Sequence, residues 1–372
     1  MPKVTYNNKN AVFFKSLKID VENYFKSNNI SKTGNWSLYI KAIVLIAAAV
    51  SLYLFILFSD AAAGWKIASC ALFGVTLACI GFNVMHDACH GSYSSKKWVN
   101  ELLGLTLNAL GGNAFFWKQK HNIIHHTYTN IDGVDDDIAK SPFIRMCSTQ
   151  KWVPAHKVQH IYLPFLYMLG SIFWIFAKDF ENYFSKKVYT TPISNLSKKE
   201  HWIFWISKSL YFVFYIILPI VIVGFLPWLL GFVVMHFTMG FTLSIVFQLA
   251  HVVEETEFAF IAEDSTDTLF LESEWAVHQI KTTANFSPDS KVISWFVGGL
   301  NFQIEHHLFP RVSHVHYPAL SKIVEEKCKE FDLNYISIPT MGQAINSHFK
   351  LIKDLGQKPE IKNMHPVAAM TV

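Results

Sequence analysis

Four long apolar stretches constrain the fold of this 372-residue chain more than any other feature. A helix needs about 20 apolar residues to cross the hydrocarbon core of a bilayer. The sequence comes close to this length at residues 38–58, 65–83, 207–226 and 228–250. Hydrophobic residues make up 51% of the chain and charged residues only 16%, which is unlike a soluble domain. We therefore predict an all-α integral membrane protein with four transmembrane helices.

A short turn joins the predicted spans of each pair, so the four helices form two hairpins. The turns are SDAAAG at 59–64 and GFLPW at 224–228. Neither can hold a domain, so both lie on one face of the membrane. The long segments lie on the opposite face and carry nearly all the Lys and Arg, which makes that face cytoplasmic by the positive-inside rule. We predict a cytoplasmic N-terminal segment at 1–37 and one membrane domain at 38–372 with a cytoplasmic helical cap.

A fifth apolar run, at residues 161–177, is shorter and contains Pro164 and Gly170. If it crossed the membrane, the later segments would lie on the wrong face. We therefore predict that it lies in the membrane interface.

Charge and cysteine content narrow the possible partners. The formal net charge is +4, and the Lys and Arg form no stripe, so we expect no nucleic acid partner. The five cysteines show no CxxC motif or regular framework and are expected to be free thiols. Polar residues continue to about residue 37, so we predict no cleavable signal peptide.

Histidine gives the second strong signal, because seven of the 17 histidines form three clusters next to the predicted spans. The clusters are His86 and His90 in HDACH, His121, His125 and His126 in HNIIHH, and His306 and His307 in QIEHH. A single histidine pair arises easily by chance. Three clusters that the topology brings to the same cytoplasmic face indicate a metal site.

The spacing within the clusters predicts how the rings point. On an α-helix, His86 and His90 share one side, and so do His121 and His125. His126 then points about 100° further round the helix. Neutral imidazole binds Fe, Zn, Cu and Ni, but seven to nine ring nitrogens are too many for one tetrahedral zinc. We therefore predict two metal ions with open positions for oxygen.

The remaining histidines carry weaker signals. His251 ends the fourth span and would lie beside the first cluster. His236 lies inside that span, where an interior hydrogen bond is the expected role. His314 and His316 are equally compatible with a contact to the ligands and with a surface position. Ordinary structural or surface roles are expected for His156, His160, His201, His348 and His365.

These clusters resemble the three histidine boxes of the membrane-bound fatty acid desaturases. The segments TYTNIDGVDDDI, QLAHVVEETEF, WAVHQIKTTANF and GGLNFQIEHHLFPRVSHVHYP narrow the resemblance to the front-end acyl desaturases of the delta-6 type. It extends from about residue 38 to about residue 340. The resemblance implies a cytoplasmic cap that holds two irons and inserts a cis double bond into an acyl chain with O2 and two electrons.

The resemblance also implies a ligand set and its surroundings. The seven clustered histidines would bind iron together with His251 and His278. Asp87, Asn122 and Gln303 are candidates for contacts that orient or supplement these ligands. One of Asp135, Asp136 and Asp137 is a further candidate, although a run of charge in a loop is usually solvated.

The expected function is O2-dependent desaturation between an existing double bond and the carboxyl end, with delta-6 favoured over delta-5 and delta-8. Front-end members carry Gln at the first position of the third box, as Gln303 does here. The acyl group could be carried by a lipid, CoA or a carrier protein. Residues 1–37 lack histidine and are too short for the fused cytochrome b5 domain of many members, so we expect a separate ferredoxin or cytochrome b5 type donor.

Two alternatives use similar residues differently. A fatty acyl or alkane hydroxylase has similar boxes but inserts oxygen, and Gln303 with its flanking segments argues against it. A histidine-rich metal transporter or haem-binding membrane protein would place its ligands within the spans. A zinc peptidase is excluded by the absence of HExxH, since Asp87 follows His86.

Overall fold

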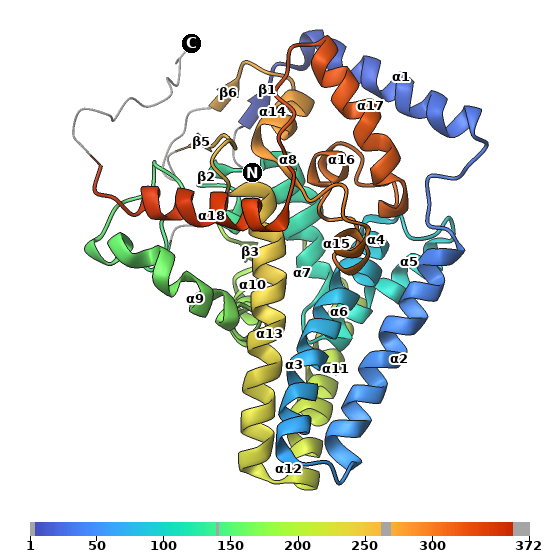
Figure 1. The fold of residues 1–372 in the computed structure, drawn as a ribbon, viewed down its shortest axis with the longest axis vertical. Coiled ribbons are helices and arrows are strands. Elements are labelled where there is room, and N and C mark those ends of the chain that lie inside the picture. Colours follow the sequence, from blue (N-terminus) through green and yellow to red (C-terminus); the bar gives the residue numbers. More distant parts are fainter. Residues whose placement is uncertain (1–3, 139–140, 262–268, 360–372) are drawn as a thin grey trace.

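The computed structural model describes residues 4–138, 141–261 and 269–359, which excludes His365, and helices dominate it. Long helices run along the main axis of the molecule, and shorter helices gather at one end of them (Figure 1). The long helices are α2 (Trp36–Phe58), α3 (Ala63–Ile80), α11 (Lys198–Phe212) with α12 (Leu218–Val223), and α13 (Phe225–His251). The all-α prediction is confirmed.

Local sequence fixes where these helices begin and turn. The Asn35 side chain accepts a hydrogen bond from the backbone N–H of Leu38 and so caps α2, and Ser197 caps α11 in the same way. Gly224 has a φ of +86°, which allows the sharp turn from α12 into α13. The outer faces are apolar: Ile43 and Val221 are 67% and 76% exposed, as lipid-facing residues would be.

Glycine lets α13 approach two other helices closely. A Cβ on Gly74 of α3 would lie 2.2 Å from the carbonyl oxygen of Met235. A Cβ on Gly240 of α13 would lie 2.6 Å from the carbonyl oxygen of Met168, in α9 (Gln159–Phe173). Helix α13 is therefore packed tightly between α3 and α9.

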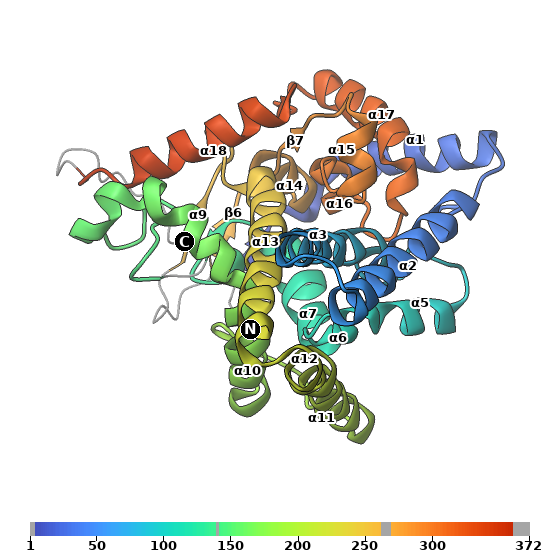
Figure 2. The ribbon, with the colours of Figure 1, turned by 60° about the horizontal axis from the view of Figure 1, so that its bottom comes forward.

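Within the described residues, five helical stretches are long and apolar enough to cross a membrane. Three of them contain the predicted spans 38–58, 65–83 and 228–250, and Lys198–Val223 contains the predicted span 207–226 up to residue 223. The fifth, at 154–185, contains α9, the π-helix η6 (Trp174–Lys178) and α10 (Asp179–Ser185), and it includes the run predicted to be interfacial. Helix α9 crosses α13 obliquely, whereas α2 and α3 run lengthwise (Figures 1 and 2). The four-span count remains a prediction.

The shorter elements form the rest of the structure. The helices are α1 (Val12–Ser27), α5 (Lys97–Gly104), α6 (Thr106–Ala109), α14 (Trp275–Thr282), α15 (Lys291–Phe296), α16 (Gln303–Leu308), α17 (Tyr317–Glu330) and α18 (Met341–Leu355). Short strands pair as β1 (Val4–Tyr6) with β6 (Leu269–Leu271), β2 (Ile131–Asp132) with β5 (Ala259–Phe260), β3 (Lys187–Val188) with β4 (Thr191–Pro192), and β7 (Asn285–Phe286) with β8 (Ser337–Ile338). The short helices α14, α16, α17 and α18 gather with α1 at one end of the long helices, and we call this end the cap (Figure 1). An apolar core with Leu17 of α1 and Val324 of α17 joins the N-terminal segment to the cap.

Two π-helices adjoin the histidine clusters. The first, η2 (Gly81–Met85), joins α3 to α4 (His86–His90). The second, η3 (Gln119–His125), joins α7 (Ala114–Lys118) to α8 (His126–Tyr128). A π-helix bonds residue i to residue i+5, so it changes which side chains share a face.

Candidate metal centre

Histidines from three distant parts of the chain meet in what we call the first group. It consists of His86 and His90 of α4, His121 of η3 and His306 of α16, and their ring nitrogens all lie within 4.8 Å of one another. All four side chains are buried. The Nε2 atoms of His86 and His306 lie 3.3 and 3.5 Å from the Nε2 atom of His121. Two nitrogens that each bind one metal ion at about 2.1 Å are separated by at most about 4.2 Å, so these distances suit a shared ion.

The HNIIHH cluster divides between two groups. The rings of His121 and His125 stack with their centroids 5.3 Å apart, so they share a side as their spacing predicted. Because residues 119–125 form a π-helix, His121 also faces His126, and their Nε2 atoms lie 3.2 Å apart. The α-helical spacing did not predict that second contact.

The second group contains His125, His251 at the end of α13 and His307 of α16, whose ring nitrogens again lie within 4.8 Å of one another. His126 lies between the groups, with its ring centroid 4.6 Å from that of His306 and 4.4 Å from that of His307. Among the described residues, eight of the predicted ligands therefore form one continuous buried cluster.

Four of these rings are held from outside through Nδ1. Nδ1 of His125 lies 3.0 Å from an Asp135 carboxylate oxygen, and Nδ1 of His251 lies 3.3 Å from the Thr282 carbonyl oxygen. Nδ1 of His306 lies 3.0 Å from the Tyr317 hydroxyl, and Nδ1 of His307 lies 2.8 Å from the Gln279 amide oxygen. A hydrogen bond to the second ring nitrogen is the usual way in which proteins orient a metal-binding histidine. The Nε2 atoms are therefore directed inward.

Several inward nitrogens have no protein partner. The Nε2 atoms of His90, His125, His251 and His307 are buried and make no hydrogen bond with any residue that the structure describes. Leaving a buried polar atom unpaired costs about 1–3 kcal/mol, so a native structure normally satisfies it. Metal ions between the rings would do so, and the donor set fits them.

Burial keeps most of these rings in the neutral form that binds metal. Desolvation and then the neighbouring histidines lower the pKa of His121, His126, His306 and His307. His125 differs. Burial opposes its protonation, but Asp135 and Asp137 outweigh that effect and raise its pKa above the usual value.

The structure does not bring His278 into either group. Its Nε2 atom donates a hydrogen bond to the carbonyl oxygen of Thr129 at 2.8 Å, and its ring packs against Tyr6. The next residue, Gln279, is the one that contacts the site, through His307. The geometry therefore gives no support to His278 as a ligand.

Asp87 has its main partners on the opposite side from the rings. One carboxylate oxygen accepts a hydrogen bond from the Ser313 hydroxyl at 2.7 Å and lies 3.0 Å from Nδ1 of His314. The other lies 3.8 Å from Nδ1 of His86, which is too long for a direct hydrogen bond. His314 is itself buried, with Nε2 3.3 Å from the ammonium nitrogen of Lys41. His314 is thus linked to the site through Asp87 and is not a surface residue.

The other two candidates for outer contacts also differ from a simple ring-orienting role. Asn122 donates a hydrogen bond to the carbonyl oxygen of Cys89 at 2.9 Å, which ties η3 to α4. Gln303 is buried at the start of α16, and its amide oxygen has no hydrogen-bond partner among the described residues. That oxygen is available to a ligand that the chain does not supply.

The Asp135–Asp137 run is not a solvated loop. Asp135 is only 1% exposed, and it accepts hydrogen bonds from His125 and from the backbone N–H of Asn130 at 3.0 Å. Asp136 and Asp137 pair with Lys120. The usual interpretation of a charged run fails here because the loop folds back onto η3.

Two other histidines test the remaining expectations. His236 is buried between the Ser171 and Tyr211 hydroxyls, at 2.9 and 2.8 Å, which confirms the interior hydrogen bond. His348 is fully buried, with Nε2 2.9 Å from the Tyr167 hydroxyl and Nδ1 2.6 Å from the Val252 carbonyl oxygen. It ties α18 to α9 and α13, so it has a larger structural role than expected.

Sequence reasoning missed Gln279, Thr282 and Tyr317, which hold ligand rings. Gln279 and Thr282 lie in WAVHQIKTTANF, the segment that made His278 a candidate ligand. The segment does contact the site, but through these two residues and not through His278. Tyr317 lies in the segment GGLNFQIEHHLFPRVSHVHYP, but nothing in that segment singled out this residue.

Comparison with known proteins agrees with this geometry. The family model for the fatty acid desaturases matches residues 63–339, which include all three histidine clusters. The chain belongs to the fatty acid desaturase family. It is an oxidoreductase of lipid metabolism that introduces double bonds into fatty acyl chains.

Relatives cover nearly the whole chain. It is 35% identical to the sn-1 linoleoyl-lipid 6-desaturase of Arthrospira platensis, over 97% of this chain and 96% of the relative. It is 33% identical to the enzyme of the same name from Synechocystis sp., over 93% and 96%. It is 34% identical to the acyl-lipid (8-3)-desaturase of Physcomitrium patens, over 93% of this chain and 72% of the relative.

Proposed function

We propose that this protein is a front-end acyl-lipid desaturase with two iron ions in its two histidine groups. The observation that carries the proposal is the set of buried, inward-facing imidazole nitrogens that no described residue satisfies. Iron accepts imidazole ligands and supports the O2 chemistry that attack on an unactivated methylene requires.

The residues of the chain would divide the work as follows. The first ion would be held by His86, His90, His121 and His306, and the second by His125, His251 and His307, with His126 able to serve either. When bound, the irons supply the oxidant that removes two hydrogens from the acyl chain with O2 and two electrons.

Outer contacts keep the ligand nitrogens aimed at the ions. Asp135, Gln279 and Tyr317 hold Nδ1 and thereby fix the orientation of each ring. The amide oxygen of Gln303 lies buried on the same helix as His306 and His307, where it can bind an ion weakly or through water.

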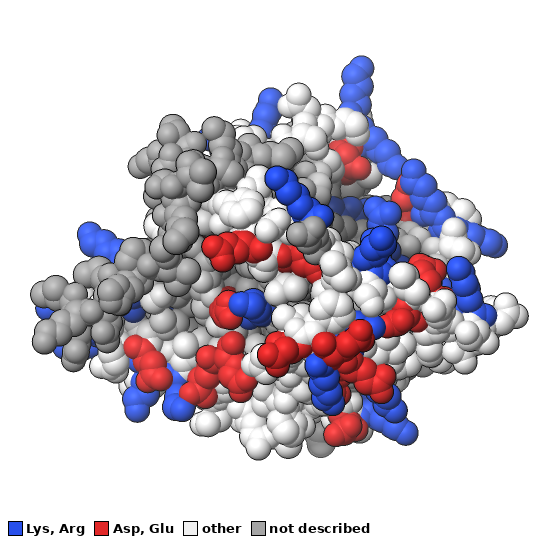
Figure 3. Space-filling model, turned by 90° about the horizontal axis from the view of Figure 1, so that it is seen from above, with Lys and Arg blue, Asp and Glu red and all other residues white. Residues whose placement is uncertain are grey.

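We propose that the cap lies on the cytoplasmic face and that α9 lies in the interface. In support, residues 209–253 contain no Lys, Arg, Asp or Glu, whereas the cap carries both signs of charge, as Figure 3 shows from above. The oblique course of α9 suits a helix at the membrane surface. In this topology the N-terminal segment (1–37) packs into the same cap as the short helices of the membrane domain, which begins near residue 38.

The likeness to 6-desaturases of linoleoyl lipids favours a linoleoyl lipid as the substrate and carbon 6 as the site of the new bond. Relatives described as (8-3)- and delta-5 desaturases make neighbouring positions the next alternatives. A separate ferredoxin or cytochrome b5 type protein would deliver the electrons to the cap.

Expression in a host without its own desaturases tests this function. The host is fed linoleate, oleate or saturated acids in separate cultures, and new double bonds are located by mass spectrometry. We expect gamma-linolenate from linoleate, in lipid-bound form. A new bond only on the methyl side, a delta-9 bond in saturated chains, or hydroxylated products would contradict the proposal.

A further inference from the structure

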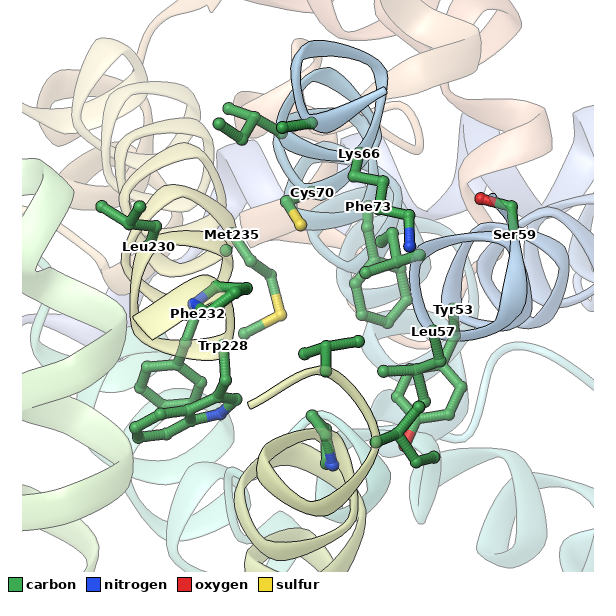
Figure 4. Close-up of a pocket in the computed structure, with 18 of the residues that line it drawn as sticks. Tyr53, Leu57, Ser59, Lys66, Cys70, Phe73, Trp228, Leu230, Phe232 and Met235 are labelled. Atoms are coloured by element: carbon green, nitrogen blue, oxygen red, sulfur yellow. The ribbon is translucent and has the colours of Figure 1, made fainter. Parts of the chain in front are cut away.

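A cavity of about 630 Å³ lies between the long helices, at the end that faces away from the cap in Figure 1, and Figure 4 shows its lining. It is formed by the end of α2, the start of α3, the end of α12 and the start of α13. Its inner wall includes Phe73, Tyr215 and Met235. A volume of this size is typical of sites for small molecules, and the apolar wall suits a hydrocarbon chain.

This cavity is separate from the histidine groups. Phe73, at its inner end, precedes His86 by 13 residues along one continuous helical stretch. At 1.5 Å per residue the separation is about 20 Å. If the proposed function is correct, the part of a linoleoyl chain beyond carbon 6 is shorter than this distance, so the methyl end of the substrate does not fill the cavity.

The charged residues that line the cavity lie where α2 ends and α3 begins. Lys66, Ser59 and Asp60 are among its lining residues, and Figure 4 shows the Lys66 side chain along the wall that α2 and α3 form. The Lys66 side chain makes no hydrogen bond or ion pair with any described residue. The Ser59 hydroxyl oxygen is buried and likewise lacks a partner among the described residues.

The position of Lys66 is unfavourable unless an anion lies nearby. It is the fourth residue of α3, where the helix dipole repels a cation, and neither an acidic residue nor a side-chain cap compensates. A helix N-terminus of this kind attracts anions through its free N–H groups. A Cβ at Gly64 would meet nothing within 4 Å, so an anion can approach the backbone there.

We propose that this cavity binds one anionic phospholipid from the leaflet opposite the cap. Its phosphate would lie against Lys66, the Ser59 hydroxyl and the start of α3, and one acyl chain would run inward to Phe73. Asp60 and Lys66 are the only charged residues in 42–80, and 209–253 contains none, so Lys66 is the one cation available to a headgroup at this end. Asp60 is exposed.

The test uses the purified full-length chain in detergent, stripped of lipid and titrated with dioleoylphosphatidylglycerol or dioleoylphosphatidylcholine. Native mass spectrometry counts the bound lipids. We expect one tightly bound phosphatidylglycerol per chain. Lys66→Gln should weaken its binding about tenfold and leave phosphatidylcholine binding unchanged, because only the charge-assisted contact is lost.

Two further variants keep the test specific. Lys97→Gln removes a lysine in α5 whose side chain is 91% exposed and should change nothing. Ala63→Phe places a ring at the mouth of the cavity and should weaken binding of both lipids. Equal affinity for the two lipids in the native chain, equal effects of Lys66→Gln and Lys97→Gln, or retention of an unesterified fatty acid in place of phospholipid would overturn the proposal. None of these results bears on the desaturation assay.

Discussion

Individual imidazoles in this site are distinguished by which of their two nitrogens is already engaged. His251, His306 and His307 use Nδ1 for an outer hydrogen bond, so Nε2 is left for a metal ion. His278 uses Nε2 for the Thr129 carbonyl and points no unpaired nitrogen at the site. The difference gives two predictions.

Gln279→Leu should weaken iron binding about 10- to 100-fold, because the His307 ring loses the acceptor that orients it. Iron per chain is measured after equilibration with a competing chelator. Gln279→Glu keeps an oxygen acceptor and should retain most of the iron. Equal iron content in the native chain and Gln279→Leu would show that the contact does not orient the ligand.

His278→Gln should keep its iron, whereas His251→Gln should lose most of one ion. The first change removes a buried hydrogen bond and should lower the free energy of unfolding by about 1 kcal/mol. The second removes one of the three ring nitrogens that form the second group. Iron analysis of both variants decides between eight and nine ligands, and loss of iron from His278→Gln would restore it to the ligand set.

At the scale of elements, the sequence predicted which segments carry the ligands but not how one of them winds. The contact of His121 with His126 in HNIIHH follows from a π-helix, and no residue type signals that pattern of backbone hydrogen bonds. Tertiary contacts supply it: Asn122 binds the α4 backbone, and Asp135 binds His125. Those partners are distant or in a loop, so a periodicity argument could not include them.

Helix α13 offers a prediction about packing, because Gly240 lies against the backbone of α9. Gly240→Leu should lower the free energy of unfolding by about 1–3 kcal/mol, since its Cβ would lie 2.6 Å from the Met168 carbonyl oxygen. Gly64→Ala is the matched control, because its Cβ meets nothing within 4 Å. Melting temperatures in one detergent make the comparison, and equal losses would refute the close contact.

The buried ring of His348 links helix α18 to α9 and to the end of α13. His348→Ala should destabilise the protein by about 1–3 kcal/mol, because it leaves the Tyr167 hydroxyl and the Val252 carbonyl without their partner. The iron content of the folded fraction should stay unchanged. A melting temperature equal to that of the native chain would support the minor role that the sequence suggested.

At the scale of the whole molecule, the chain divides into an apolar bundle and a cap, with the candidate metal site where the two meet. Composition and the four apolar stretches sufficed to predict the bundle, because lipid-facing helices leave a strong signal in sequence. The cap left a weaker one. Its short helices pack by long-range contacts, such as that of α1 with α17, and Gln279 and Tyr317 reach the ligands across such contacts. Histidine clustering revealed the site despite this because its ligands lie close together in sequence.

The site should also stabilise the molecule as a whole, because its ligands come from α4, η3, α13 and α16. An ion that binds only the folded state stabilises it by an amount that grows with the ratio of free ion to Kd. We expect about two irons per purified chain, as the two groups of ring nitrogens indicate. Stripping the iron with a chelator should lower the melting temperature by several degrees. Fe(II) should restore it and Mg²⁺ should not, because magnesium prefers oxygen ligands. Active protein that contains only zinc, or a melting temperature unaffected by the chelator after complete iron loss, would contradict a di-iron centre that links the cap to the bundle.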